Sequence, residues 1–390
     1  MANAAAEGRV VTAEGQLTLA VDGRRYGGWT SINIERSLDI FSDTFSLGYT
    51  DRWAEHKETW PIREGAAAQV YFGEELLLTG FVNVAEWKVT GEDWSLTANG
   101  RSRSGDLEDC SATHFPGIWK GMSPLKIAQQ ICEPFLIDVS STSANALRTI
   151  NRFALQEGET NHGALERLCE QVALLPVSLP DGNIELLRAD VPRDKVIVLP
   201  VESAVERCIQ TNDQERFSQY FVVGQSRGNR NRAGKAVVSA RYKVLDQSVK
   251  RFRPIVLMAE HGEAQLASLE ARAKWERNLR AGRSMRYKCV LLGVLGPDKR
   301  AWRPGTHCVV KDLQLGVDET LVLVRANVRA SSSELATELE LTRPEAYSVV
   351  EYPPKQLNPK PRIAPPEQNA CIDVSEEELA WLNERRSSGA

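Results

Sequence analysis

Histidines are the first residues to inspect for catalysis or metal binding, because imidazole is a frequent general base and the commonest metal ligand. The chain has five scattered histidines: His56, His114, His162, His261 and His307. None has a second His or a carboxylate at a metal-ligand spacing in a suitable context. His307 precedes Cys308, but adjacent side chains of a strand face opposite sides and do not form one ligand set. The pattern predicts structural histidines, with no metal or cofactor site.

Carboxylates are the second candidates, and Glu108 and Asp109, beside Cys110, are the most suggestive pair. A glycosidase needs two carboxylates across a cleft, in environments that push their pKa values apart. Nothing in the local sequence marks such a pair. The chain also has no nucleophile elbow, Walker loop or HExxH helix. We therefore expect no catalytic residues and no enzyme activity.

The cysteines are odd in number, widely spaced and without a CxxC motif, which argues against a disulfide framework and a zinc ribbon. Reduced thiols made in a cytoplasm are the simplest interpretation. The seven are Cys110, Cys132, Cys169, Cys208, Cys289, Cys308 and Cys371.

A basic stretch at 227–253 carries nine Lys or Arg residues and one acid, Asp246, and could contact phosphate backbones. Tyr242 and Phe252 interleave with it, but without the regular spacing of a stacking platform. A solvated loop is the favoured interpretation, and contact with nucleic acid is the alternative. The candidate contact residues are Arg227, Arg230, Arg232 and Lys235.

The size and charge of the chain limit its class. Its 390 residues are enough for two to four domains, and a net charge of −4 gives no global attraction to nucleic acid or membrane. Residues 1–11 lack the basic and apolar regions of a signal peptide, and no apolar run approaches membrane-spanning length. We expect no membrane insertion and no export by the general secretory route.

A β-rich unit occurs twice, once near each end of the chain. In both copies Trp, Pro and Gly precede a short strand, a turn, an apolar strand, a second turn and an alternating strand. The first copy runs through 60–65, 69–72, 77–82 and 94–98, and the second through 302–305, 308–311, 320–324 and 338–342. Alternating segments that bury one face favour an antiparallel barrel or sandwich. A duplicated unit indicates assembly rather than chemistry.

Helical patterns interrupt the strands in two places. Ser123 can cap a helix that has Pro124 in its first turn, and a second helix is predicted to begin near Thr160. A further helix is predicted at 263–279, within an insertion in the second β-unit. The patterns therefore predict a fold that is mainly β with α+β: β-rich units near both ends, a small α+β domain in the middle and an inserted helix-containing segment.

The predicted boundaries follow these changes of pattern. They are 1–103 for the first barrel, 104–198 for the α/β domain, 199–225 with 285–350 for the second barrel, 226–284 for the insertion and 351–390 for a tail.

The tail begins with six prolines between 353 and 366, which favour an extended linker. A capping box at 375–378 precedes three apolar residues of a short amphipathic helix, Leu379, Trp381 and Leu382. The pattern is typical of a docking arm for a partner, and a solvated, frayed tail is the alternative.

In combination, ten short motifs resemble the baseplate hub protein of Mu-like contractile-tailed bacteriophages, within the wider tail-hub superfamily. The likeness extends from about residue 15 to 350. The motifs are FSL (45–47), DRW (51–53), WPIREG (60–65), TGFV (79–82), GDLEDCSA (105–112), QEGET (156–160), ALERL (164–168), RFSQY (216–220), RAKWE (272–276) and WRPG (302–305).

This resemblance implies a fold of two tube-like antiparallel β-barrel domains, a small α/β domain and an inserted helix-containing domain. It also implies a homotrimer whose three chains form a ring of six similar barrels. Such a ring adapts a six-fold tail tube to a three-fold spike and forms part of the DNA ejection channel. The implied partners are further copies of the chain, the central spike protein, the tail tube or tube-initiator protein, the tape-measure protein and double-stranded DNA passing without sequence-specific binding. The implied location is the virion tail baseplate, assembled in the host bacterial cytoplasm. The family has no catalytic motif to carry over.

Three alternatives remain open at this stage. The same hub could belong to a tailocin or another contractile injection system, and the genes beside it would decide. From a different class, the chain could be a tail-associated cell-wall hydrolase. A carbohydrate-binding β-sandwich would need exposed aromatic platforms, whereas residues such as Trp29, Trp87 and Trp94 mostly lie where strand packing can absorb them.

Overall fold

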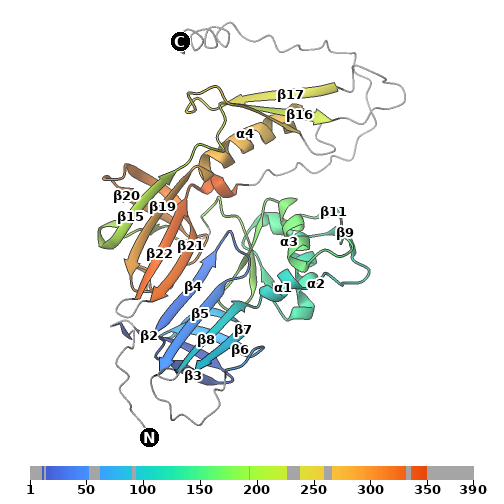
Figure 1. Ribbon diagram of the computed structural model, residues 1–390. Coiled ribbons are helices and arrows are strands. Elements are labelled where there is room, and N and C mark those ends of the chain that lie inside the picture. Colours follow the sequence, from blue (N-terminus) through green and yellow to red (C-terminus); the bar gives the residue numbers. More distant parts are fainter. Residues whose placement is uncertain are drawn as a thin grey trace. The chain divides into compact units, whose positions relative to one another are not determined.

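Most of the regular structure in the described part of this protein is β-strand, arranged in four sheets (Figure 1). The computed structural model describes residues 11–12, 15–51, 62–89, 94–192, 194–225, 238–258, 266–330 and 335–348. The largest sheet has 14 strands and contains strands from both ends of the described chain. The predicted class, mainly β with a smaller α+β part, is confirmed.

The first β-module consists of five antiparallel strands. They are β4 (Ser31–Ser37), β5 (Thr44–Asp51), β6 (Ala67–Phe72), β7 (Glu75–Val89) and β8 (Trp94–Ser102). Their order in the sheet is β6-β7-β8-β5-β4. Beyond β6, the sheet continues through β2 (Gly15–Val21), which pairs with β3 (Arg24–Gly27) and β1 (Val11–Thr12). Asp22 and Gly23 turn between β2 and β3 with positive φ angles, as a type I′ hairpin requires.

The second β-module repeats this arrangement. Its strands are β15 (Ala204–Thr211), β19 (Met285–Leu292), β20 (His307–Asp312), β21 (Val317–Ala330) and β22 (Leu335–Thr342). Their order is β20-β21-β22-β19-β15, which matches the first module strand for strand, and the pairs are again antiparallel. β14 (Ile197–Val198) adds a short parallel pair beside β20. The duplication expected from the sequence is confirmed in the strand topology.

The turn before the third strand of each module, β6 or β20, shows the repeat at the level of hydrogen bonds. Gly65 N donates to Val82 O at 2.7 Å, and Gly305 N donates to Leu323 O at the same distance. Both glycines have positive φ, 79° and 85°, a region that side chains disfavour. This equivalence corrects the sequence alignment: Trp302 corresponds to Ile62, and both side chains are buried. The first residue of the WRPG motif therefore aligns with the third residue of the WPIREG motif and not with its tryptophan.

A small α/β unit lies between the modules in the chain. Its elements are α1 (Gly105–Asp109), β9 (Ile118–Met122), α2 (Pro124–Cys132), β10 (Val139–Ser140), β11 (Ile150–Ala154), α3 (Asn161–Glu170), β12 (Leu175–Ser178) and β13 (Ile184–Leu187). The two predicted helices are confirmed: α2 follows Ser123, and the Thr160 hydroxyl accepts a hydrogen bond from Gly163 N at the start of α3. The helices bury Ile127 and Leu165 in the core of this unit.

A second set of elements separates β15 from β19. It comprises β16 (Gln219–Gln225), β17 (Val238–Leu245), β18 (Pro254–Met258) and α4 (Leu266–Arg283). β16 pairs with both other strands, and α4 packs Leu269 and Ala273 against Val222 and Val244. α4 extends past the predicted end at 279, because Glu276 pairs with Arg280 one turn further on.

The exact domain boundaries listed above remain predictions, and the tail at 351–390 lies outside the described residues. None of the described helices combines the length and apolar character needed to cross a membrane.

Candidate functional site: an assembly edge rather than an active site

The two β-modules join through one strand pair, β4 with β21, which we call the closed seam. Its register places Ile34 opposite Val328 and Glu35 opposite Asn327. Ile34 is fully buried and Val328 is 1% exposed, so both belong to the core of the first module. Arg325 forms an ion pair with Glu35 across the seam at 2.8 Å. The seam therefore merges two modules into one sheet with shared apolar and polar contacts.

Two buried charges lie beside the closed seam. The Arg36 guanidinium on β4 donates to the carbonyl oxygen of Trp302, which belongs to the second module. Burial lowers the pKa of Arg36, and the nearby Asp43 carboxylate opposes that effect. Burial raises the pKa of Asp43 to about 7, against the attraction of Arg36. This junction is thus a desolvated polar contact whose charge state varies near neutral pH.

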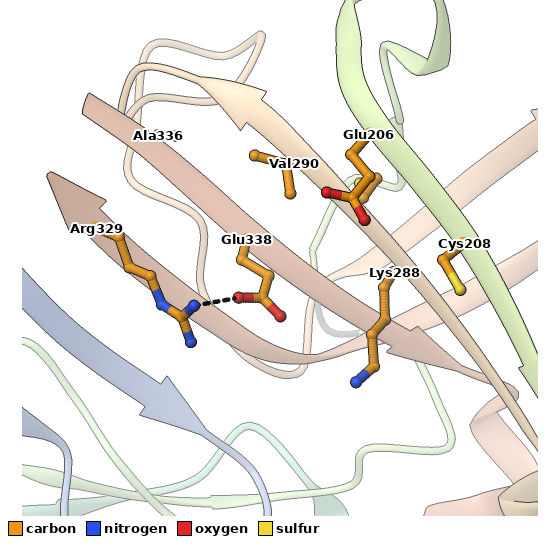
Figure 2. Close-up of a pocket in the computed structure, with 8 residues that line it drawn as sticks. Glu206, Cys208, Lys288, Val290, Arg329, Ala336 and Glu338 are labelled. Carbon is orange, nitrogen blue, oxygen red and sulfur yellow. Dashed lines mark ion pairs between the residues drawn. The ribbon is translucent and has the colours of Figure 1, made fainter. Parts of the chain in front are cut away.

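A shallow hollow of about 340 Å³ lies on the polar face of the second module (Figure 2). Glu206 and Cys208 from β15, Lys288 from β19 and Glu338 from β22 point into it. Glu338 pairs with Arg329 of β21 at 3.2 Å. Acids and bases alternate here, and the two lining cysteines, Cys208 and Cys289, have no histidine among the other lining residues. The arrangement is that of a solvated sheet face and offers no nucleophile activated by a base.

Glu108 and Asp109, the carboxylates singled out from the sequence, do not face each other across a cleft. Both contact one guanidinium, that of Arg101, with Glu108 at 3.6 Å. Burial raises the pKa of Glu108, and the hydrogen bond from Arg101 lowers the pKa of Asp109. The shared cation makes them an ion-pair cluster that links α1 to β8, which is a structural role.

The histidines that the structure describes are also held in packing contacts. His307 is 4% exposed, its Nε2 lies 3.0 Å from the Ala189 carbonyl oxygen, and burial lowers its pKa. His114 stacks on Trp119, and His162 stacks on Phe41. Within the described ranges, no group of three or more His, Cys, Asp or Glu side chains could hold a metal ion.

Of the cysteines in the described ranges, four are buried and two, Cys110 and Cys208, are exposed; none is in a disulfide. Burial raises the pKa of the thiols of Cys132, Cys289 and Cys308 to about 12. These buried thiols are core residues.

The binding residues predicted from sequence, Arg227, Arg230, Arg232 and Lys235 in the loop and Leu379, Trp381 and Leu382 in the tail, lie outside the described residues. Of the basic residues after the loop, Arg251 pairs with Asp213. Asp246, the one acid of the stretch, pairs with Arg216 at 2.7 Å.

The residues that sequence reasoning missed lie on the second half of β7. Val84, Trp87 and Val89 are 52%, 43% and 73% exposed. Trp87 is thus an exception to the expectation that strand packing absorbs the tryptophans. The local signal, alternation along 84–89, was present, but the same alternation marks a buried strand.

Comparison with known proteins gives the class of the chain. Residues 16–102 match the family model described as Mu phage baseplate assembly protein GpP-like, N-terminal. Residues 104–188 match the model described as baseplate hub protein gp44-like, second domain. Together with the fold, these matches show that the chain is similar to phage tail proteins of the baseplate hub type.

Individual relatives agree with this class. The chain is 26% identical to the baseplate hub protein gp44 of Escherichia phage Mu over 314 residues, which are 79% of this chain and 82% of that protein. The 43 kDa tail protein of prophage MuSo2 from Shewanella oneidensis matches with a TM-score of 0.75 and 26% identity, over 86% of this chain and 100% of the other. A tail protein from Neisseria meningitidis MC58 shares the fold, with a TM-score of 0.69 and 21% identity over 86% of this chain and 99% of the other. The resemblance to Mu-like hub proteins predicted from sequence is confirmed.

Proposed function

We propose that this protein is the structural hub of a contractile-tail baseplate and acts as a homotrimeric ring of six β-modules. The observation that carries the proposal is the repeat itself: one chain contains two modules of identical strand order, joined in one sheet by β4 and β21. Three such chains around an axis supply six similar modules to a six-fold tube and three identical chains to a three-fold spike.

The oligomeric state is the first test. Three chains of 43.3 kDa have a mass of about 130 kDa. Size-exclusion chromatography with light scattering, with and without a candidate spike protein, should give this trimer mass. A protein that stays at the mass of one chain under both conditions would contradict the ring.

A pore for ejected DNA should not hold the phosphate backbone. The polar face of the shared sheet supports this role because its basic side chains lie beside acids. Arg329 pairs with Glu338, and Glu340 lies 3.5 Å from Arg286 and 3.7 Å from Lys288. We expect weak binding of duplex DNA without sequence preference, measured by gel shift at several salt concentrations. Tight binding with a steep salt dependence would argue against a passive conduit.

The hub role is non-enzymatic in this proposal. The clustering of Glu108 and Asp109 on one guanidinium supports that view. A cell-wall zymogram of the purified protein should show no clearing, and clearing that disappears in a Glu108→Gln variant would establish the hydrolase alternative. A neighbouring set of capsid genes would distinguish a phage hub from a tailocin hub.

Two partner contacts belong to the same proposal. The tail residues Leu379, Trp381 and Leu382 dock on a tail component, and the loop residues Arg227, Arg230, Arg232 and Lys235 face a partner rather than the pore. Deletion of 366–390 should leave the trimer intact and reduce its capture by the spike or the tube. Unchanged particle assembly after the deletion would remove the docking role.

A further inference from the structure

Among the strands of the two β-modules, β7 and β15 each have a long stretch of edge that pairs with no other strand in the described parts of the chain. One is the second half of β7, where Val84–Val89 pair with β8 alone. The other is β15, which pairs with β19 alone. An unpaired edge presents free backbone donors and acceptors and readily accepts another strand.

These two edges are the repeat equivalents of the two strands that form the closed seam. β7 corresponds to β21, and each has a bulge at the same place, between Val82 and Val84 in β7 and between Leu323 and Arg325 in β21. β15 corresponds to β4, since Ile209 lies opposite Tyr287 as Ile34 lies opposite Phe45. Within one chain, β4 and β21 therefore pair as the closed seam, whereas their equivalents β15 and β7 do not pair with each other.

Core-facing side chains on the closed seam are buried, whereas the equivalent side chains on the two free edges are more exposed. Trp87 is 43% exposed, whereas its equivalent in β21, Val328, is 1% exposed. Ile209 is half-buried on β15, whereas its equivalent Ile34 is fully buried on β4. The two modules differ here because β4 and β21 cover each other and β7 and β15 have no such cover among the described strands. The free edges thus expose side chains at positions that the repeat normally buries.

We propose that the free edge of β7 in one copy pairs with the free edge of β15 in a neighbouring copy, as an open seam that repeats the closed one. The inference rests on the proposed ring and specifies which strands of neighbouring copies are in contact. Transferring the closed-seam register places Trp87 opposite Ile209, Lys88 opposite Cys208 and Glu86 opposite Gln210 of the neighbour. The aromatic ring then covers the isoleucine on the core face, and Lys88 lies on the polar face next to Glu206.

The described strands of one chain do not make this pair. In the sheet order, β8, β5, β4, β21, β22 and β19 separate β7 from β15. The described strands of one chain thus leave both edges available to a neighbouring copy. The contact is head-to-tail, because the two edges differ, and head-to-tail contacts close into rings when the rotation between copies allows it.

A cysteine placed at Lys88 tests the register directly. Directly opposed residues of antiparallel strands have Cα atoms about 4.5–5.5 Å apart, within the range of a disulfide. Cys208 is already exposed at the predicted partner position. The variant Lys88→Cys is made with Cys110→Ser, which removes the other exposed thiol of the described residues, and every variant of this series also carries Cys371→Ser. It is treated with oxidised glutathione, which accepts the two electrons of the bond. We expect a non-reducing gel ladder of two and three linked chains that ends at the trimer.

Two matched variants control for nonspecific linkage. Adding Cys208→Ser to the first variant should abolish the ladder. Trp87→Cys with Cys110→Ser places the thiol one residue away, on the opposite face of the strand, and should give no ladder. Links that persist in either control, or a light-scattering trimer in which Lys88→Cys gives none, would overturn the seam while leaving the ring proposal standing. A chain that neither trimerises nor links would overturn both.

A second measurement concerns the apolar contact. Trp87→Asp changes an exposed side chain, so the thermal midpoint of the single chain should stay within about 2 °C, as for surface changes generally. The dissociation constant of the assembly should rise about 100-fold, as expected when a central tryptophan of an interface is lost. Glu74→Asp, at an exposed position between β6 and β7, is the control and should change neither value. An unchanged dissociation constant for Trp87→Asp would contradict the proposal.

Discussion

The two β-modules share a strand order but use their first strand differently. β4 pairs with β5 on one edge and β21 on the other, and its Ile34 is fully buried. β15 pairs with β19 alone, and alternate residues along it are exposed. The comparison teaches two things. The strand order inside a module is the same whether or not another strand pairs with its outer edge. Whether the side chains of the first strand are buried depends on that outer neighbour.

The connection from the first to the second strand also differs between the two modules. In the first module β4 leads into β5 through a short turn, and Leu38 N donates to Val324 O at 2.8 Å, at the bulge of β21. In the second module the inserted sheet and α4 lie between β15 and β19. The insertion extends from the chain without changing the strand order, because both strands of the pair keep their register. Loops tolerate such insertions at low entropic cost.

Truncation of the equivalent isoleucines, Ile34 and Ile209, is expected to give the largest difference in stability between the two modules. Ile34→Ala removes fully buried atoms at the closed seam and should lower the free energy of unfolding by about 2–5 kcal/mol. Ile209→Ala at the half-buried position on β15 should cost less than about 1 kcal/mol in the single chain. Urea denaturation of both variants at low protein concentration measures the two values, and equal losses would contradict the difference between the seams.

The pH dependence of stability should reveal the buried charges at the closed seam. The pKa of Asp43 is about 7 in the folded protein, against about 4 in an unfolded chain. Below pH 4 both states are protonated. Between about pH 4 and 7 the unfolded state loses its proton first, so stability should fall as pH rises, by on the order of 3 kcal/mol.

Asp43→Asn should flatten this slope, whatever its effect on absolute stability, because the substituted amide does not titrate. Asp22→Asn changes an exposed aspartate in a turn that tolerates asparagine and should keep the wild-type slope. Denaturation midpoints at pH 4.5, 5.5 and 6.5 give the comparison. A wild-type slope retained in Asp43→Asn would assign the titration to another group.

The equivalent glycines provide a smaller contrast. A methyl group on Gly65 would meet no heavy atom within 4 Å, whereas one on Gly305 would lie 2.6 Å from Leu187 Cδ2. Both substitutions impose a left-handed conformation on alanine, which costs about 1–2 kcal/mol. Gly305→Ala should therefore destabilise the protein by about 1 kcal/mol more than Gly65→Ala. Thermal unfolding of the two variants measures this difference. A larger loss of stability in Gly65→Ala would show that the two turns are not equivalent.

The ion pair across the closed seam is expected to have the smallest effect. A double-mutant cycle with Arg325→Ala and Glu35→Ala should give a coupling of about 0.5–1 kcal/mol, because both side chains are partly exposed. The equivalent positions of the open seam are Val84 and Gln210. Val84→Arg combined with Gln210→Glu should transfer the pair and tighten the assembly severalfold, more at low salt than at high salt. The single variants Val84→Arg and Gln210→Glu, which add a charge without its partner, are the matched controls and should not tighten the assembly to the same extent.

The sequence by itself determined the repeat, the helices of the α/β unit and the absence of familiar catalytic motifs. Local patterns are sufficient for these features: alternation marks strands, Ser123 and Thr160 mark helix starts, and glycines mark turns that need positive φ. Even here the equivalence of Ile62 and Trp302 was missed, because it depends on hydrogen bonds of the turn rather than on residue type.

Only the tertiary structure decided that β4 pairs with β21, nearly the whole described chain away, while β7 and β15 keep an open edge. The alternation of Val84, Glu86 and Lys88 with Trp87 fits a buried strand as well as an edge, since alternation reports which face a side chain takes and not what covers that face. Similarly, residue types could not place Glu108 and Asp109 on one guanidinium or bury Asp43 beside Arg36. Such pairings depend on the register between distant strands, which no local segment of the chain encodes.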